Sequence, residues 1–150
     1  MLSGKKCLVT GGAGAIGMAI AKELANARAT VVSADVTFSG NYLCREKTIE
    51  SGIIKCFMDV TNGKIVEDVI NKYWDLLGGI DVLVNCAGIL RCKTFDNLSE
   101  DEWNQTIKIN LTGAYIVSSL IFKKNEEQQR RGNYKYHFRR GRDRFNFIIC

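Results

Sequence analysis

The chain has 150 residues, of which 46% are hydrophobic and 25% charged, with 14 glycines and no proline. These values lie near globular averages and the length suits one folded core, which excludes a wholly disordered, collagen-like or low-complexity chain. No stretch approaches the roughly 20 apolar residues that a membrane helix needs, and residues 1–14 contain no continuous apolar signal core.

The cysteine and histidine content bears on metals and on the compartment. Six cysteines form no C-x-x-C pair, and with one histidine in the whole chain they match no zinc-ligand spacing. We therefore expect reduced thiols, a cytoplasmic location, no metal site and no membrane contact.

Positive charge is concentrated at one end of the chain. Residues 130–150 carry seven lysines and arginines against Asp143, a net charge of +6, whereas the rest of the chain sums to −1. We therefore treat residues 1–132 as a globular portion and residues 133–150 as a separate basic tail.

The globular portion alternates strands and helices. Short apolar runs predict strands at residues 6–10, 30–34, 53–58 and 81–85. Apolar residues at three- and four-residue steps predict helices at 16–27 and 65–77. A capped acidic turn at 99–102 predicts the start of a longer helix, which is interrupted near 112–113 and runs toward 124. The polar segment 36–52 is expected to be a loop with a short helix. This order predicts an α/β fold, an open doubly wound parallel sheet of about four strands that binds its ligand beyond the carboxyl ends of the strands.

The turn between the first strand and the first helix has the strongest chemical signal. Gly12, Gly14 and Gly17 follow the G-x-G-x-x-G spacing, which lets backbone amides approach a pyrophosphate while the helix directs its N-terminal N–H groups at the anion. A tight structural turn without a ligand is the alternative. Because a strand precedes the glycines and a helix follows them, we interpret the turn as a dinucleotide site.

A carboxylate follows each of the next two strands. Asp35 can accept hydrogen bonds from the adenosine ribose and would repel a 2′-phosphate, so it favours NAD over NADP; an ordinary loop aspartate is the alternative. Asp59 can accept a hydrogen bond from the adenine amino group, cap the following helix, or do both.

These residues and two later motifs resemble the short-chain dehydrogenase/reductase superfamily. The similarity covers residues 5–132 and rests on residues 10–17, Asp59-Val60, residues 85–88 and residues 108–113. Ala15 stands where the single-domain branch usually has glycine, as in the extended, sugar-nucleotide-modifying branch, but the two later motifs favour the single-domain branch. Cys86 replaces an asparagine of the family, which should loosen the hydrogen bonding between strands.

The resemblance implies a Rossmann-type cofactor site and part of an active site. It assigns the diphosphate to Gly11, Gly14, Ala15, Ile16 and Gly17, the adenosine ribose to Asp35, the adenine to Asp59 and Val60, and the surroundings of the nicotinamide ribose to Asn85, Ala87 and Gly88. It also implies that Asn110 is the active-site asparagine whose backbone carbonyl holds a proton-relay water.

The chemistry that the resemblance implies is hydride transfer between nicotinamide and a carbonyl or alcohol carbon. The family uses a tyrosine as acid or base, a lysine four residues later that lowers its pKa, and a serine that positions the substrate. No Tyr-x-x-x-Lys occurs here, and no serine follows Ser119. We therefore expect the cofactor-binding half of an NAD-dependent oxidoreductase, inactive as written; a non-catalytic NAD-binding module is the alternative. An intact family member is expected to form homo-oligomers.

The basic tail stands where the family has its fifth strand and its catalytic serine. A one-nucleotide shift over the codons of residues 133–141 can spell Ile-Ile-Asn-Ile-Thr-Ser-Val-Ala-Gly, so we interpret the chain from about residue 133 onward as out of frame. The alternatives are a solvated tail and a segment that binds single-stranded nucleic acid through its interleaved cations and aromatic rings. Without a fifth strand, residues 82–84 are expected to form an uncovered apolar edge in a marginally stable fold.

Overall fold

The computed structural model describes residues 2–39, 52–131 and 146–149. In chain order the elements are β1 (Lys6–Thr10), α1 (Ala15–Asn26), β2 (Thr30–Asp35), β3 (Ile53–Phe57), α2 (Gly63–Leu77), β4 (Val82–Asn85), a 3-10 turn (Phe95–Asn97), α3 (Glu100–Ile107), a π-helical turn (Lys108–Gly113), α4 (Ala114–Arg131) and β5 (Asn146–Ile149). The strands and helices predicted within the described residues are confirmed, with small shifts at their ends. Most of the predicted loop and short helix at 36–52 lies outside the described residues.

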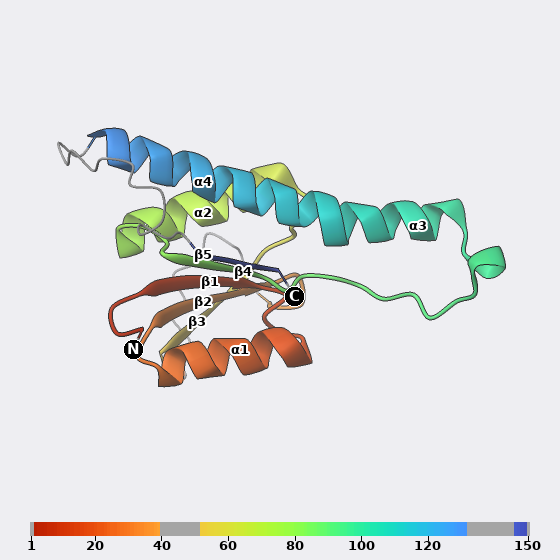
Figure 1. Ribbon diagram of the computed structural model, residues 1–150, viewed down its shortest axis with the longest axis horizontal. Helices are drawn as coiled ribbons and strands as arrows, with labels where there is room; N and C mark the ends of the chain where they lie inside the picture. The colour runs from red at the N-terminus through yellow and green to blue at the C-terminus, as the bar shows by residue number, and fades with distance from the viewer. Residues whose placement is uncertain (1, 40–51, 132–145, 150) are drawn as a thin grey trace.

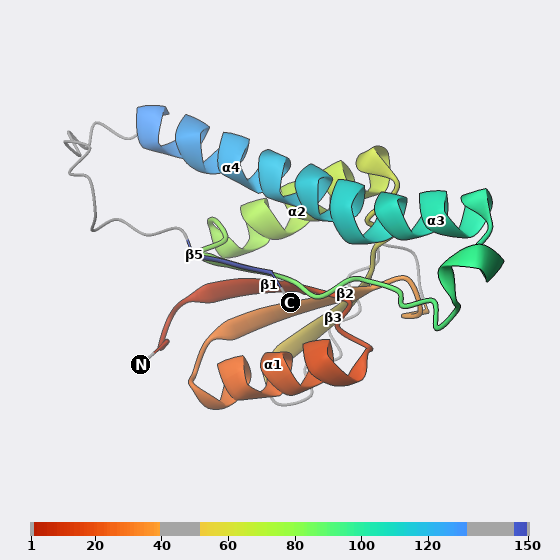
Figure 2. The same cartoon turned by 45° about the vertical axis from the view of Figure 1, so that its right-hand side comes forward.

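The strands form one parallel sheet in the order β3-β2-β1-β4-β5. Helix α1 covers one face, and α2 and α4 cover the other (Figures 1 and 2). This arrangement confirms the doubly wound α/β fold, because each crossover between parallel strands must pass over one face of the sheet.

The edge beside β4 differs from the expectation. Instead of being left uncovered, β4 pairs in parallel with β5, with Val82 opposite Asn146 and Asn85 opposite Ile149. Composition had grouped these residues with the basic tail, but Phe147, Ile148 and Ile149 form a short run of residues that favour strands. Residues 133–145, which include most of the segment interpreted as out of frame and most of the tail's cations, lie outside the described residues.

The core consists of two layers, one on each face of the sheet. Leu8, Val32 and Leu83 pack on the side of α2 and α4, whereas Val9 and Val31 pack on the side of α1. Since neighbouring residues of each central strand are buried on opposite faces, the strands are continuously apolar, as parallel strands covered on both faces must be.

Helix α2 begins and ends at residues whose roles are clear in the structure. The Asn62 side chain accepts hydrogen bonds from the Lys64 and Ile65 amides, and Gly78 ends the helix with a φ of 75°. Asparagine is a favoured N-cap and glycine adopts this left-handed conformation without strain. Asn62 therefore caps α2, and Asp59 does not; of the two roles left open for Asp59, the helix cap is wrong.

The described cysteines include buried thiols that are held neutral. Cys7, Cys56, Cys86 and Cys92 form no disulfide. Burial raises the pKa of Cys56 to about 12 and that of Cys7 to about 11. Burial also raises the pKa of Tyr73, a residue of α2 whose side chain hydrogen-bonds Cys56. These thiols therefore stay protonated at neutral pH and serve as core side chains.

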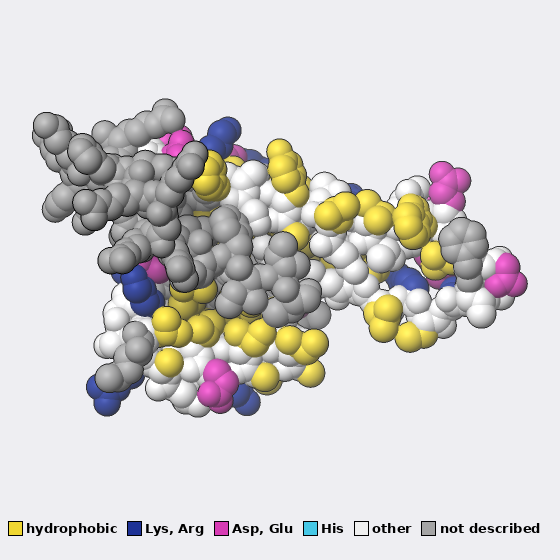
Figure 3. Space-filling view, in the orientation of Figure 1, with side chains coloured by type: hydrophobic (Ala, Val, Ile, Leu, Met, Phe, Trp, Pro, Cys, Tyr) yellow, Lys and Arg dark blue, Asp and Glu magenta, His cyan; other side chains and the backbone are white. Residues whose placement is uncertain are grey.

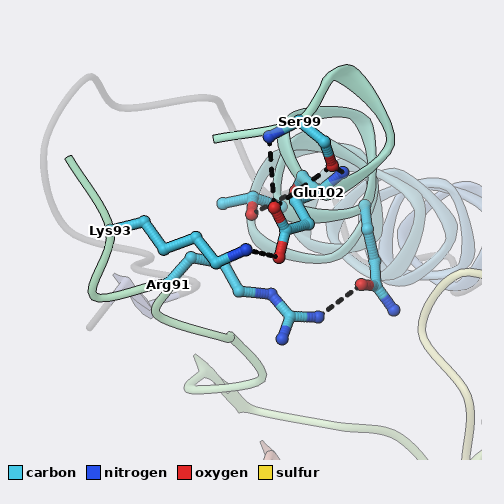
Figure 4. A network of polar contacts seen from close by, with 6 residues as sticks. Arg91, Lys93, Ser99 and Glu102 are labelled. Atoms are coloured by element: carbon cyan, nitrogen blue, oxygen red, sulfur yellow. Dashed lines mark hydrogen bonds and ion pairs between the residues drawn. The ribbon is translucent and has the colours of Figure 1, made fainter. Parts of the chain in front are cut away.

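The segment between β4 and α3 extends beyond the sheet and is held by polar contacts (Figures 1 and 4). The predicted capping turn is confirmed: the Ser99 hydroxyl accepts from the Glu102 amide, and the Glu102 carboxylate accepts from the Ser99 amide. Lys93 Nζ lies 2.7 Å from Glu102 Oε1, and Arg91 donates to Gln105. The hydrogen bond from Lys93, followed by that from the Ser99 amide, lowers the pKa of Glu102 to about 2.

Helix α4 has apolar side chains on more than one side. Figure 3 shows hydrophobic side chains over α1 and along α3 and α4. On α4, Val117 and Ile121 are buried against the sheet, whereas Tyr115 and Phe122 are more than half exposed. No helix in the described part of the chain is both long and apolar enough to cross a bilayer.

Candidate functional site

A cavity of about 420 Å³ opens where the carboxyl ends of the strands meet. Its walls come from the turn after β1, the residues after β2 and β3, the segment after β4, and the π-helical turn. The lining residues are Gly11, Ala13, Gly14, Asp35, Val36, Thr37, Met58, Asp59, Val60, Cys86, Ala87, Gly88, Ile89 and Ile109. A doubly wound sheet binds its ligands at this edge, so this cavity is the candidate site.

Close contacts explain why the first turn needs glycine. Gly11 has a φ of 66°, and a Cβ there would lie 2.5 Å from the Cys86 carbonyl oxygen. A Cβ on Gly17 would lie 2.2 Å from the Gly11 carbonyl oxygen. Gly11 therefore lets the turn approach β4, and Gly17 lets α1 start directly against the turn.

The amides of this turn divide into two groups. Those already used inside the protein belong to Gly12, Ala13 and Gly14, which donate to the Ala34 carbonyl, the Asp35 carboxylate and the Gly11 carbonyl, each at 3.1 Å. The next three amides, of Ala15, Ile16 and Gly17, have no acceptor in the described part of the chain, and the first turn of α1 contains no acidic residue. Unused N–H groups at a helix N-terminus are the backbone groups that bind anions in other proteins.

The two predicted carboxylates line the cavity beside the glycine turn. Asp35 is 9% exposed; its Oδ2 accepts from the Ala13 amide, and its Oδ1 accepts from the Thr37 amide and hydroxyl at 2.9 and 2.8 Å. Asp59 Oδ1 accepts from the Thr61 amide and hydroxyl, both at 2.8 Å. The carboxylates therefore offer hydrogen-bond acceptors, whereas the glycine turn offers donors.

The segment after β4 is held at both ends by side chains. Thr10 Oγ1 accepts from the Cys86 and Ala87 amides at 3.2 and 3.1 Å. Asn110 accepts from the Ile89 amide through Oδ1 and donates to the Ile89 carbonyl through Nδ2, both at 2.9 Å. The π-helical turn thus clamps the backbone that forms this wall of the cavity. Turns of this kind are frequent at functional sites.

The structure brings some of the predicted site residues together and separates others. Seven line the cavity, namely Gly11, Gly14, Asp35, Asp59, Val60, Ala87 and Gly88. Five do not line it, namely Ala15, Ile16, Gly17, Asn85 and Asn110. The first three of these present the unused backbone amides. Asn110 holds the backbone of Ile89, which does line the cavity.

Asn85 is directed away from the cavity. Its Nδ2 donates to the Ser118 hydroxyl of α4 at 3.1 Å, and the side chain is 4% exposed. Its Oδ1 is buried without a hydrogen-bond partner in the described part of the chain. The side chain of Asn85 therefore joins β4 to α4, while its backbone pairs with Thr10 and Ile149.

Sequence reasoning missed the two threonines that bond the carboxylates. A signal was available, because Asp35-Val36-Thr37 and Asp59-Val60-Thr61 are the same tripeptide at the ends of neighbouring strands. The pairing of Asn110 with Ile89 had no such signal, since 21 positions separate the two residues.

Comparison with known proteins assigns the family. The sequence profile of the family described as short chain dehydrogenase matches residues 5–133. The chain belongs to the short-chain dehydrogenase family. Short-chain dehydrogenases bind NAD or NADP.

Individual relatives agree with this assignment. An uncharacterized oxidoreductase of Thermotoga maritima is 36% identical, with 88% of this chain and 51% of the relative aligned. The 3-oxoacyl-[acyl-carrier-protein] reductase FabG of Aquifex aeolicus is 33% identical, with 85% and 53% aligned. The ligand-free structure of an aldohexose dehydrogenase from Thermoplasma acidophilum superposes with a TM-score of 0.68 at 31% identity over 81% of this chain and 44% of that one. The chain spans about half the length of the curated relatives it matches.

Proposed function

We propose that this chain binds NAD in preference to NADP, as the cofactor-binding part of an oxidoreductase. The observation on which the proposal depends is the cavity itself, which is lined by Asp35, Asp59 and the glycine turn that leads into the free amides at the start of α1. The diphosphate of the cofactor accepts hydrogen bonds and carries negative charge, so it suits the amides. The adenosine hydroxyls and amino group donate hydrogen bonds, so they suit the carboxylates.

The preference for NAD follows from charge. Asp35 is buried in the cavity wall with its carboxylate fixed by the Ala13 and Thr37 amides. A phosphate on the adenosine ribose would place a second anion beside this carboxylate, where the surrounding protein screens the repulsion less than bulk water does. A ribose hydroxyl would donate a hydrogen bond instead.

For a protein of the relatives' full length we propose hydride transfer between the nicotinamide and a carbonyl or hydroxyl-bearing carbon. A 3-oxoacyl reductase and an aldohexose dehydrogenase are among the proteins similar to this chain. Among the family's catalytic residues, the 150-residue chain contains a match for the asparagine, Asn110, but no Tyr-x-x-x-Lys. For this 150-residue chain we therefore propose cofactor binding alone. The cytoplasmic location and homo-oligomeric assembly remain predictions.

Calorimetric titration of the 150-residue chain tests the proposal. We expect NAD+ to bind more tightly than NADP+. Asp35→Asn should reduce that preference by about tenfold or more, because it removes both a charge-assisted hydrogen bond to the ribose and the repulsion between the carboxylate and the phosphate of NADP+. Asp75→Asn, an exposed position of α2, makes the same charge change away from the cavity and should leave the preference unaltered. Absence of binding by either dinucleotide at millimolar concentration, or an unchanged preference in Asp35→Asn, contradicts the proposal.

A further inference from the structure

The same tripeptide ends two neighbouring strands. Asp35-Val36-Thr37 follows β2 and Asp59-Val60-Thr61 follows β3. In both, the threonine amide and hydroxyl donate to Oδ1 of the aspartate, and the four distances lie between 2.8 and 2.9 Å. Two separate stretches of chain therefore fold into the same hydrogen-bonded turn.

The two turns lie side by side at the cavity. In the parallel register of β2 and β3, Asp35 is opposite Phe57, and the Met58 amide donates to the Asp35 carbonyl at 3.2 Å. Asp35, Thr37 and Asp59 all line the same cavity. The two carboxylates therefore face the ligand from one wall.

The two carboxylates differ in the acceptor positions that remain. An ionised carboxylate has about four acceptor positions, two on each oxygen. Within the described part of the chain, Asp35 uses three of them, on the amide and hydroxyl of Thr37 and on the Ala13 amide. Asp59 uses two, both on Oδ1, within the described part of the chain. Each aspartate thus keeps Oδ2 for a further donor, with one position left at Asp35 and two at Asp59.

The threonine hydroxyl fixes which oxygen stays available. The torsion that turns an aspartate carboxylate is broad, so the single backbone amide at Asp59 leaves the carboxylate plane free to turn, whereas at Asp35 the Ala13 amide already restrains the second oxygen. A second donor on the same oxygen, supplied by the threonine hydroxyl, holds Oδ1 toward the turn and Oδ2 toward other donors.

We propose that Thr37 and Thr61 are positioning residues for the adenosine half of the dinucleotide. By occupying Oδ1, Thr37 reserves Oδ2 of Asp35 for one ribose hydroxyl, and Thr61 reserves Oδ2 of Asp59 for the adenine amino group. The inference rests on the proposed cofactor function and adds to it two residues that act through the aspartates.

The test replaces each hydroxyl while keeping the shape of the side chain. Thr37→Val and Thr61→Val remove the hydroxyl, and Thr37→Ser and Thr61→Ser keep it. Affinities of the full chain are measured for NAD+, ADP-ribose, nicotinamide mononucleotide and nicotinamide hypoxanthine dinucleotide, which has a carbonyl in place of the adenine amino group. We expect each valine variant to weaken the binding of NAD+ and ADP-ribose about fivefold, because a less firmly oriented carboxylate makes a weaker hydrogen bond to the adenosine half. The mononucleotide should bind as tightly as before, and each serine variant should bind like the parent.

The hypoxanthine analogue separates the two turns. Thr61→Val should leave its affinity unchanged, because the amino group that Asp59 would accept from is absent, whereas Thr37→Val should weaken it as much as it weakens NAD+. The inference is overturned if the valine variants bind NAD+ like the parent, if serine fails to restore binding, or if the mononucleotide weakens equally.

The result remains informative if one variant fails to fold. Thr37 is exposed, so Thr37→Val and its serine partner test the inference even if the half-buried Thr61 tolerates no change. A shifted preference in Asp35→Asn with unaltered valine variants overturns the role of the threonines and leaves the proposed function standing. An unaltered preference in Asp35→Asn contradicts the proposed function itself.

Discussion

Where the cavity meets β1, β2 and β3, its walls are held by backbone contacts and by hydrogen bonds to the backbone. Gly11 lies against Cys86, Gly17 lies against Gly11, and Asp35 is buried. Where the cavity meets the segment after β4, the wall is held by the exposed Asn110. The residues farther along, here called the arm (residues 90–102), are held by the contact of Lys93 with Glu102. The first region therefore depends on steric fit and on hydrogen bonds between buried groups and the backbone. The second depends on exposed polar contacts, which are individually weak.

The largest expected effect comes from adding one methyl group to the steric region. Gly11→Ala should lower the free energy of unfolding by about 3 kcal/mol or more, because a left-handed φ of 66° is combined with a Cβ 2.5 Å from the Cys86 carbonyl oxygen. Urea unfolding of both proteins measures the difference.

Gly4 provides the matched control for that substitution. Its φ is 76°, but a Cβ there has no neighbour within 4 Å, so Gly4→Ala should cost only about 1–2 kcal/mol of backbone strain. Equal losses in the two variants would show that backbone conformation, and not the contact with Cys86, makes glycine necessary at Gly11.

A smaller effect is expected where side chains hold the wall. Asn110→Ala removes both hydrogen bonds to Ile89, which together stabilise this segment by about 1–3 kcal/mol. Hydrogen exchange should show faster exchange of the Ile89 amide and little change in β1 or β2. Asn104→Ala, on the exposed surface of α3, is the control. Unaltered exchange at Ile89 would mean that this wall is held by other contacts.

The smallest effect is local and depends on pH. The folded pKa of Glu102, about 2, lies below its ordinary value of 4.5, so ionised Glu102 stabilises the arm above about pH 4.5, and this stabilisation is lost as the pH falls toward 2. NMR titration of the Glu102 carboxyl checks the value. Lys93→Met should raise this pKa toward 4.5, since the hydrogen bond from Lys93 is its largest cause, whereas Glu100→Gln should leave it low. A pKa that stays near 2 in Lys93→Met contradicts the assignment.

The part of the fold that could be predicted is the part set by neighbours in sequence. The glycine turn, the capping box of Ser99 with Glu102, and the helix interruption near Gly113 each depend on residues a few positions apart. The interruption has a tertiary reason as well, because a Cβ on Gly113 would lie 2.7 Å from Val60 Cγ2. That contact between distant segments has no signature in either stretch of sequence.

The predicted site residues divide in the same way. Asp35 and Asp59 were found because they follow strands whose carboxyl ends meet at one edge of a parallel sheet. Asn85 also ends a strand, but the strand pleat turns its side chain to the face of the sheet that α4 covers, where it hydrogen-bonds Ser118 of α4. Strand β5 was missed because four residues within a basic segment give too short a pattern to indicate a strand. Its strand conformation depends on pairing with β4.

The sequence by itself determined the βα order, the glycine turn and the positions of both carboxylates, because hydrophobic periodicity and glycine spacing act over a few residues. Only the tertiary structure decided which oxygen of each carboxylate remains available, which amides of α1 are unused, how Asn110 holds Ile89, and where β5 lies. Those features depend on hydrogen bonds and contacts formed after the chain has folded. Apart from the local bonds of Thr37 and Thr61, their partners are set by packing rather than by adjacency in the sequence.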